Sequence, residues 1–206
     1  MSATITPVTP VSISSVTALP KAGTTTQAGD GDSLGITDPA AATTPVTLTP
    51  PPAGSFAINV GTSGAMVSVA GEGTATLTIG GLTDAAGNAL DQSGAAIGIS
   101  DNYAGSVIAD FSNAFISGDT KVNPDAVLGG ADATTGSIRA NAPAGLDFTG
   151  DAAPNLYINT GKGADQIGGS DKNDFVRAGA GNDEVNAGSG DDIVRLGVGS
   201  DKASLG

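Results

Sequence analysis

Cysteine and histidine are both absent from this 206-residue chain. Without them it cannot form disulfides, thiolate or imidazole metal sites, or the Ser-His-Asp and Cys-His pairs of hydrolases. Aromatic residues make up only 3% of the sequence and tryptophan is missing, which excludes a large aromatic-rich core. We therefore predict that the chain is not an enzyme, with no catalytic residues and no site for an organic cofactor.

Basic residues are also scarce, with eight Lys and Arg against 21 Asp and Glu and a net charge of −13. Such a chain is not expected to bind nucleic acid, because phosphate recognition needs clustered Lys and Arg. No apolar run approaches the length of a membrane span. The first 20 residues have neither a basic segment nor an unbroken apolar segment, so they are not expected to form a Sec-type signal peptide.

Glycine and aspartate are what the chain has in abundance. There are 32 Gly, and almost all of the acidic residues are Asp rather than Glu. Asp favours turns and cation sites, whereas Glu favours helices. This composition predicts turns and thin repeats.

The first 54 residues are rich in Thr, Ser, Pro, Ala and Gly and end in "TPPPAG". Such a segment buries too little apolar surface to offset the entropy of ordering, so it is expected to be a disordered or extended arm. A glycosylated stalk or an assembly arm is the functional alternative.

Residues 55–141 are predicted to form a small β-rich domain. Residues 55–60 alternate, with Phe56, Ile58 and Val60 on one face, and residues 74–79 alternate in the same way. The segment 101–116 fits a short helix and a pair of strands equally well. Residues 82–90 resemble a turn of bacterial immunoglobulin-like repeats, and equally a generic turn rich in Asp, Gly and Asn.

Residues 160–204 form five nonapeptides: TGKGADQIG, GSDKNDFVR, AGAGNDEVN, AGSGDDIVR and LGVGSDKAS. The sixth position of every unit is aspartate, which is a true repeat signal. The eighth position is Ile, Val, Val, Val and Ala, and glycine fills the second and fourth positions in four units. A turn of six residues followed by a strand of three would bury the eighth residue. Two units then make one coil, and successive coils stack as parallel strands.

Turns on one edge of such a stack come from alternate units. Asp165, Asp183 and Asp201 are then expected on one edge, and Asp174 and Asp192 on the other. Carboxylates about 5 Å apart repel by about 1 kcal/mol in water and about 3 kcal/mol at an effective dielectric of 20. Ca²⁺ fits best, since it takes six to eight oxygens and accepts main-chain carbonyls, which left-handed glycines can direct inward. Mg²⁺ demands a tighter octahedron.

The pattern resembles the repeat-in-toxin (RTX) or hemolysin-type calcium-binding nonapeptide, G-G-x-G-x-D-x-U-x, in which U is a large aliphatic residue. The resemblance covers residues 160–204, with a degenerate lead-in coil at 142–159. It implies an all-β fold, with a C-terminal parallel β-roll over 142–206 behind the β-rich domain and the arm. Its cofactor is Ca²⁺.

The resemblance also implies ligands, with each ion between two stacked turns of one edge. One site would use Gly161, Gly163 and Asp165 with Gly179, Gly181 and Asp183. A second would use the last of these turns with Gly197, Gly199 and Asp201. A third would pair Asp174 with Gly188, Gly190 and Asp192. The second nonapeptide departs from the pattern, because Ser170 and Lys172 replace both of its glycines.

Three functions are compatible with such repeats. The first is a secreted or cell-surface structural or adhesive protein, including surface-layer subunits, that folds on extracellular Ca²⁺ after type I secretion. The alternatives are the non-catalytic portion of a larger RTX enzyme, or part of a toxin. Because the chain stops within the array, it is expected to be part of a larger protein. Calcium ions are the expected partners, together with self-association or other surface proteins.

Overall fold

The computed structural model describes residues 5–92, 95–100, 102–112, 115, 156–159, 164–169 and 174–206. Within these described residues, two short 3₁₀ helices, η1 (Ile13–Ser15) and η2 (Pro39–Ala42), accompany fifteen strands. The strands are β1 (Val11–Ser12), β2 (Thr25–Gln27), β3 (Asp32–Ile36), β4 (Val46–Thr49), β5 (Ser55–Val60), β6 (Met66–Val69), β7 (Thr76–Thr83), β8 (Ala96–Ile99), β9 (Val107–Asp110), β10 (Leu156–Asn159), β11 (Gln166–Gly168), β12 (Asp174–Arg177), β13 (Glu184–Asn186), β14 (Ile193–Arg195) and β15 (Lys202–Ser204).

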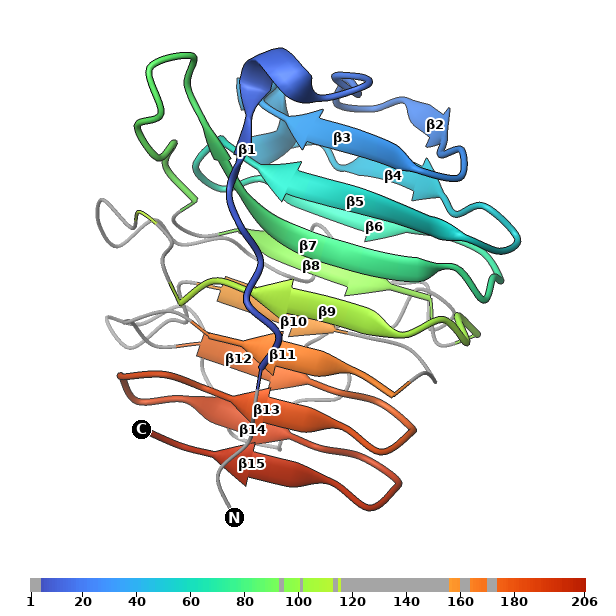
Figure 1. Ribbon diagram of the computed structural model, residues 1–206, viewed down its shortest axis with the longest axis vertical. Helices are drawn as coiled ribbons and strands as arrows, with labels where there is room; N and C mark the ends of the chain where they lie inside the picture. Colours follow the sequence, from blue (N-terminus) through green and yellow to red (C-terminus); the bar gives the residue numbers. More distant parts are fainter. Residues whose placement is uncertain are drawn as a thin grey trace.

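The strands form two sheets that face each other along the molecule (Figure 1). One has the order β15-β13-β11-β9-β7-β5-β3, with β1 pairing to β7 outside that path, and the other has the order β14-β12-β10-β8-β6-β4-β2. All pairings between these strands are parallel. The chain therefore winds as a parallel β-solenoid in which alternate strands belong to opposite sheets. This confirms the predicted all-β class and the parallel β-roll.

Coil length distinguishes two regions. In the repeat coils, which we define as β10–β15, each strand pairs with the strand 18 residues later, as in Gln166 with Glu184. In the N-terminal coils, defined as β2–β9, the spacing is larger and varies: Ser55 pairs with Thr76, and Leu77 with Val107. Both regions nevertheless share the same sheets, since β9 pairs with β11 and β8 with β10.

A column of inward apolar residues runs through the whole solenoid. In one sheet, registered pairs connect Leu34, Ile58, Ile79, Ala109, Ile167, Val185 and Ala203. In the other, they connect Val46, Val67, Ile97, Ile158, Val176 and Val194. The eighth position of each nonapeptide therefore points inward, as its aliphatic character predicted. Each coil contributes little apolar surface, and burial comes from stacking on its neighbours.

The expectation of a disordered or extended arm over residues 1–54 is wrong for the described part of that segment. Residues 25–49 form three strands of the solenoid, and Leu34, Ile36, Val46 and Leu48 are buried. Composition misled because it counts the apolar surface of the segment alone. Here the segment completes a core whose other half comes from β5 and β6.

The expected boundary near residue 141 between a β-rich domain and the roll is not seen either, because strands from both sides of it pair in the same sheets. The predicted strands at 55–60 and 74–79 are confirmed as β5 and β7, with Phe56, Ile58, Leu77 and Ile79 buried. Within 102–112, the described residues hold strand β9 and no helix. The lead-in at 142–155 lies outside the described residues.

Residues 82–90 comprise the end of β7 and the local turn that follows it. The carboxylate of Asp84 accepts hydrogen bonds from the main-chain N–H groups of Ala86 and Asn88 and from the Asn88 side-chain amide. This is the generic Asp-Gly-Asn turn rather than a connection between sandwich strands. Among the described residues, no helix is long and apolar enough to cross a membrane.

Candidate metal centre

The repeat coils place the predicted aspartates along the two edges of the solenoid. On one edge, the N–H of Asp165 donates to Oδ1 of Asp183 (3.0 Å), and the N–H of Asp183 donates to Oδ1 of Asp201 (3.1 Å). On the other edge, the N–H of Asp174 donates to Oδ1 of Asp192 (3.0 Å). The division of the five aspartates between two edges is as the repeat geometry predicted. The ladder of N–H to carboxylate bonds was not foreseen.

The aspartates of the repeat coils that lie nearest the N-terminal coils are buried. Asp165, Asp174 and Asp183 are 1%, 0% and 0% exposed, whereas Asp192 and Asp201 are half-buried. The second carboxylate oxygen of Asp183, Oδ2, is buried and accepts no hydrogen bond. Burial of an ionised oxygen without a partner is costly, so this atom calls for a positive ligand.

Burial also governs the titration of the aspartates. It raises the pKa of Asp183 to about 6, and the charge of Asp201 acts in the same direction, while the hydrogen bond from Asp165 opposes the shift. The pKa of Asp192 is raised as well, again mainly by burial. The array therefore resists ionisation unless a cation compensates the charge.

The glycines at the second and fourth positions adopt the left-handed conformations that the repeat predicted. The φ angles are 98° and 141° at Gly179 and Gly181, 94° and 137° at Gly188 and Gly190, and 93° and 159° at Gly197 and Gly199. The coils also stack too closely for a side chain. A Cβ on Gly197 would lie 1.7 Å from the carbonyl oxygen of Gly179, and one on Gly199 would lie 1.5 Å from that of Gly181. Carbonyl oxygens thus line the interface between successive turns.

Each predicted site fits a hard cation only if the main chain contributes ligands. Among the described residues, no three His, Cys, Asp or Glu side chains converge as a metal cluster. Two stacked aspartates would hold the ion together with turn carbonyls, a donor set made only of oxygen, which is what Ca²⁺ accepts. The third site, at Asp174, Gly188, Gly190 and Asp192, and the second, which ends at Asp201, are fully described. Gly161 and Gly163 of the first site, and the divergent Ser170 and Lys172, lie outside the described residues.

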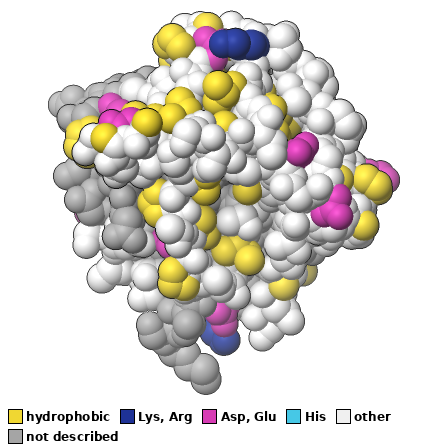
Figure 2. Space-filling model, turned by 45° about the horizontal axis from the view of Figure 1, so that its top comes forward, with side chains coloured by type: hydrophobic (Ala, Val, Ile, Leu, Met, Phe, Trp, Pro, Cys, Tyr) yellow, Lys and Arg dark blue, Asp and Glu magenta, His cyan; other side chains and the backbone are white. Residues whose placement is uncertain are grey.

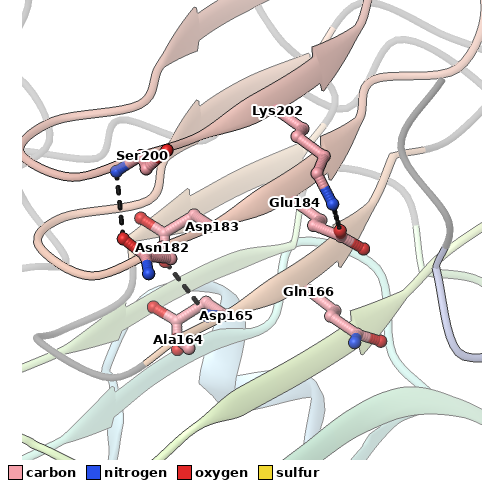
Figure 3. Close-up of a pocket in the computed structure, with 8 residues that line it drawn as sticks. All are labelled: Ala164, Asp165, Gln166, Asn182, Asp183, Glu184, Ser200 and Lys202. Atoms are coloured by element: carbon pink, nitrogen blue, oxygen red, sulfur yellow. Dashed lines mark hydrogen bonds and ion pairs between the residues drawn. The ribbon is translucent and has the colours of Figure 1, made fainter. Parts of the chain in front are cut away.

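An open groove of about 350 Å³ runs along the edge that carries Asp165 and Asp183 (Figure 3). Gln166, Glu184 and Lys202 line one side in register, and an ion pair joins Lys202 to Glu184. On the other side, Oδ1 of Asn182 accepts the N–H of Ser200 (3.0 Å). Sequence reasoning missed these contacts, although the spacing of Glu184 and Lys202 equals the coil length and could have indicated them.

The first aspartate of the array meets the N-terminal coils directly. Oδ1 of Asp165 accepts a hydrogen bond from the N–H of Val107 in strand β9 (2.8 Å). Tyr103 is buried close by, and its hydroxyl donates to the carbonyl of Ala75. Burial first, and then the charge of Asp165, raise the pKa of Tyr103 above its ordinary value. No cue in the nonapeptides indicated this junction, because its residues lie more than 50 positions away from Asp165.

These features define a parallel β-roll with oxygen-lined turns, a class of cation-binding solenoid. Residues 168–203 match the family described as the RTX calcium-binding nonapeptide repeat, in four copies. This segment is therefore an array of RTX repeats, and such repeats bind calcium ions. The match lies within the predicted range of 160–204. No curated protein and no solved structure matches the chain.

Proposed function

We propose that this chain is a secreted or cell-surface structural or adhesive protein, of the kind found in surface layers, whose repeats fold on binding extracellular Ca²⁺. The stacked, buried aspartates support the proposal most strongly. Without a cation, neighbouring carboxylates at the inter-strand spacing of about 5 Å repel by about 3 kcal/mol at an effective dielectric of 20. With one inward aliphatic residue in each nonapeptide, the repeats supply little apolar burial against that repulsion.

The aspartates and the glycines of the repeats have different roles in the proposed calcium sites. Asp165, Asp183 and Asp201 on one edge, and Asp174 and Asp192 on the other, supply negative charge. The left-handed glycines allow the turns to approach until their carbonyl oxygens lie between coils. Calcium supplies the positive charge that offsets carboxylate repulsion and satisfies oxygens such as Oδ2 of Asp183. Binding free energy then becomes folding free energy.

Extracellular location is part of the proposal. Extracellular calcium modules commonly bind in the range of about 10⁻⁴ to 10⁻³ M, so an array tuned in this way would stay unfolded in the cytoplasm and fold outside. An unfolded, acidic chain also suits passage through a type I secretion channel, as RTX resemblance implies. The face shown in Figure 2 is compatible with exposure to solvent outside the cell, because its apolar side chains form separate groups among polar and acidic ones.

A structural role accounts for the N-terminal coils better than an appendage to an enzyme does. These coils continue the same two sheets and the same inward columns, so the described strands form one continuous solenoid rather than a repeat tail beside a separate unit. We assign no catalytic step to this chain, since it has neither His nor Cys.

The test is far-UV circular dichroism during a Ca²⁺ titration, with Mg²⁺ in parallel. We expect a cooperative gain of β signal with Ca²⁺ only. Asp183→Ala should move the midpoint to at least about tenfold higher Ca²⁺, a change of about 1.4 kcal/mol, because two predicted sites share this residue. Asp191→Ala is the control for loss of one carboxylate, since Asp191 is exposed and is not one of the predicted ligands. An unchanged spectrum with Ca²⁺ would contradict the proposal.

A further inference from the structure

Residues 5–19, which we name the strap, cross the outer face of the sheet that runs from β15 to β3 (Figure 1). The strap contacts Gln166, Asp110 and Gly80, each of which precedes or follows an inward core residue of its strand. Its order of contacts follows the chain: first β11, then β9, β7 and finally β3. A single segment therefore touches both the repeat coils and the N-terminal coils.

The first contact of the strap lies on the repeat coils. The N–H of Thr6 donates to Oε1 of Gln166 (3.0 Å), and the Thr6 hydroxyl donates to the same oxygen. Gln166 directly follows Asp165 and pairs in register with Glu184 of the next coil. This anchor exists only when β11 is in place.

The remaining contacts lie on the N-terminal coils. The N–H of Val8 donates to Oδ2 of Asp110 (3.0 Å), and β1 pairs with β7 at Leu82 and Thr83. Near its end, the N–H of Thr17 donates to the Ser33 carbonyl (2.7 Å). This upper anchor requires only β3, which contains no repeat residue.

Glycines in the sheet make room for the strap. A Cβ on Gly80 would lie 2.7 Å from Cγ1 of Val8, and a Cβ on Gly35 would lie 2.9 Å from Cδ2 of Leu19. The strap sequence I-T-P-V-T-P-V has a period of three, which in polyproline II geometry places Ile5, Val8 and Val11 on one face. These three residues are half-buried, whereas the prolines between them are exposed. The fit indicates a dedicated seat rather than a chance contact.

We infer that the strap is a calcium-coupled latch: residues 5 and 6 dock when the repeat coils load calcium, and residues 16–19 stay docked in either state. The inference rests on the proposed calcium-dependent folding of the repeat coils. Because the docked Thr6 stabilises folded β11 and folded β11 holds Thr6 in place, calcium favours the docked strap and the docked strap raises calcium affinity by the same factor. The latch thereby links the chain's N-terminus to the state of its repeats.

Amide hydrogen exchange followed by NMR on the full chain tests the latch without any substitution. With Ca²⁺, the Thr6 amide should be protected; with a chelator, it should exchange at least about tenfold faster, while Thr17 stays protected in both states. If circular dichroism responds to Ca²⁺ but Thr6 exchange does not, the latch is overturned and the proposed function stands. If circular dichroism ignores Ca²⁺, both fail.

A variant remote from the ions tests the reciprocal effect. Gly80 lies in β7, far in sequence from every repeat aspartate, and Gly80→Ala places a methyl group against Val8 of the strap. This substitution should raise the Ca²⁺ midpoint about fivefold, at the lower end of typical coupling. Thr78→Ala, on the same face of the same strand, is the control and should leave the midpoint unchanged. An equal midpoint for both variants would show that strap and calcium are independent.

Discussion

The N-terminal coils and the repeat coils fill the same structural column with opposite chemistry. In β5, β7 and β9 the column holds Phe56, Leu77 and Val107, which pair in register and are buried. Ile108 pairs with Gln166, so the residues before them, Val107 and Asp165, occupy neighbouring places in this column. Asp183 and Asp201 occupy the next two places. Apolar side chains fill this place in one region, and carboxylates suited to a hard cation fill it in the other.

The opposite sheet repeats this contrast. Ala65 and Ala95, both buried, precede the registered residues Met66 and Ala96. Further along the same sheet, Asp174 takes the corresponding place, opposite Leu156. One backbone architecture therefore accepts either a small core or an ion array. What changes is the source of stability, which is apolar contact in the N-terminal coils and, under the proposed function, calcium in the repeat coils.

Removal of calcium should produce the largest difference between the regions. With a chelator, amides in β13 and β15 should exchange at rates close to those of an unfolded chain, while amides in β5 and β7 should remain protected. The reason is that only the repeat coils depend on a ligand to offset buried charge. Hydrogen exchange measured by mass spectrometry separates the two regions. Equal protection in both would remove the proposed contrast.

A cavity in the apolar column should destabilise the N-terminal coils at every calcium concentration. Leu77→Ala is expected to cost about 2–5 kcal/mol, the usual range for a buried leucine. Urea unfolding, monitored by hydrogen exchange of the β5 and β7 amides, would measure this loss of unfolding free energy. Thr76→Ala, which changes the outer face of the same strand, should cost well under half as much. A loss that disappears at high Ca²⁺ would contradict the prediction.

Two glycines with similar backbone angles can separate strain from coil packing. Gly197 has φ 93° and lies against the Gly179 carbonyl, whereas Gly87 has φ 88° and no atom within 4 Å of a built Cβ. Gly87→Ala should cost only the left-handed penalty of about 1–2 kcal/mol. Gly197→Ala should add the clash between coils and weaken calcium-induced folding. Matching losses in thermal unfolding with Ca²⁺ would mean that close stacking is unimportant.

The two regions should also respond to pH with opposite sign. Burial raises the pKa of Asp183 to about 6, so the calcium-free repeat coils should lose stability as the pH rises from about 4 to 6. Hydrogen bonds from Asn88 lower the pKa of Asp84 in the N-terminal coils, so that contribution is lost only as the pH falls below the ordinary Asp value.

The same titration should affect calcium binding, because the ion requires ionised Asp183. The Ca²⁺ midpoint is expected to be about tenfold higher at about pH 5 than at pH 7, from one group protonated one unit below its pKa. Circular dichroism titrations at both pH values provide the measurement. A midpoint that does not move would show that Asp183 is not a ligand or is already ionised.

The sequence by itself determined the repeat coils. The regular occurrence of Asp, Gly and an aliphatic residue every nine positions predicted parallel strands, an inward eighth residue and two edges of aspartates. Each of these depends only on a constant spacing, so neighbouring units have the same register. Glycine conformations at Gly179 and Gly197 followed from the same rule, because each turn repeats the one before it.

Only the tertiary structure decided what the rest of the chain does. The N-terminal coils have unequal lengths, so no period showed that Asp32 pairs with Phe56 or that Ile108 meets Gln166. The segment 25–49 is too poor in apolar residues to fold alone, and it becomes ordered because adjacent coils bury it. The hydrogen bonds from Thr6 of the strap to Gln166 and from the N–H of Val107 to Asp165 likewise join distant positions. These contacts depend on the completed stack of coils rather than on any local signal.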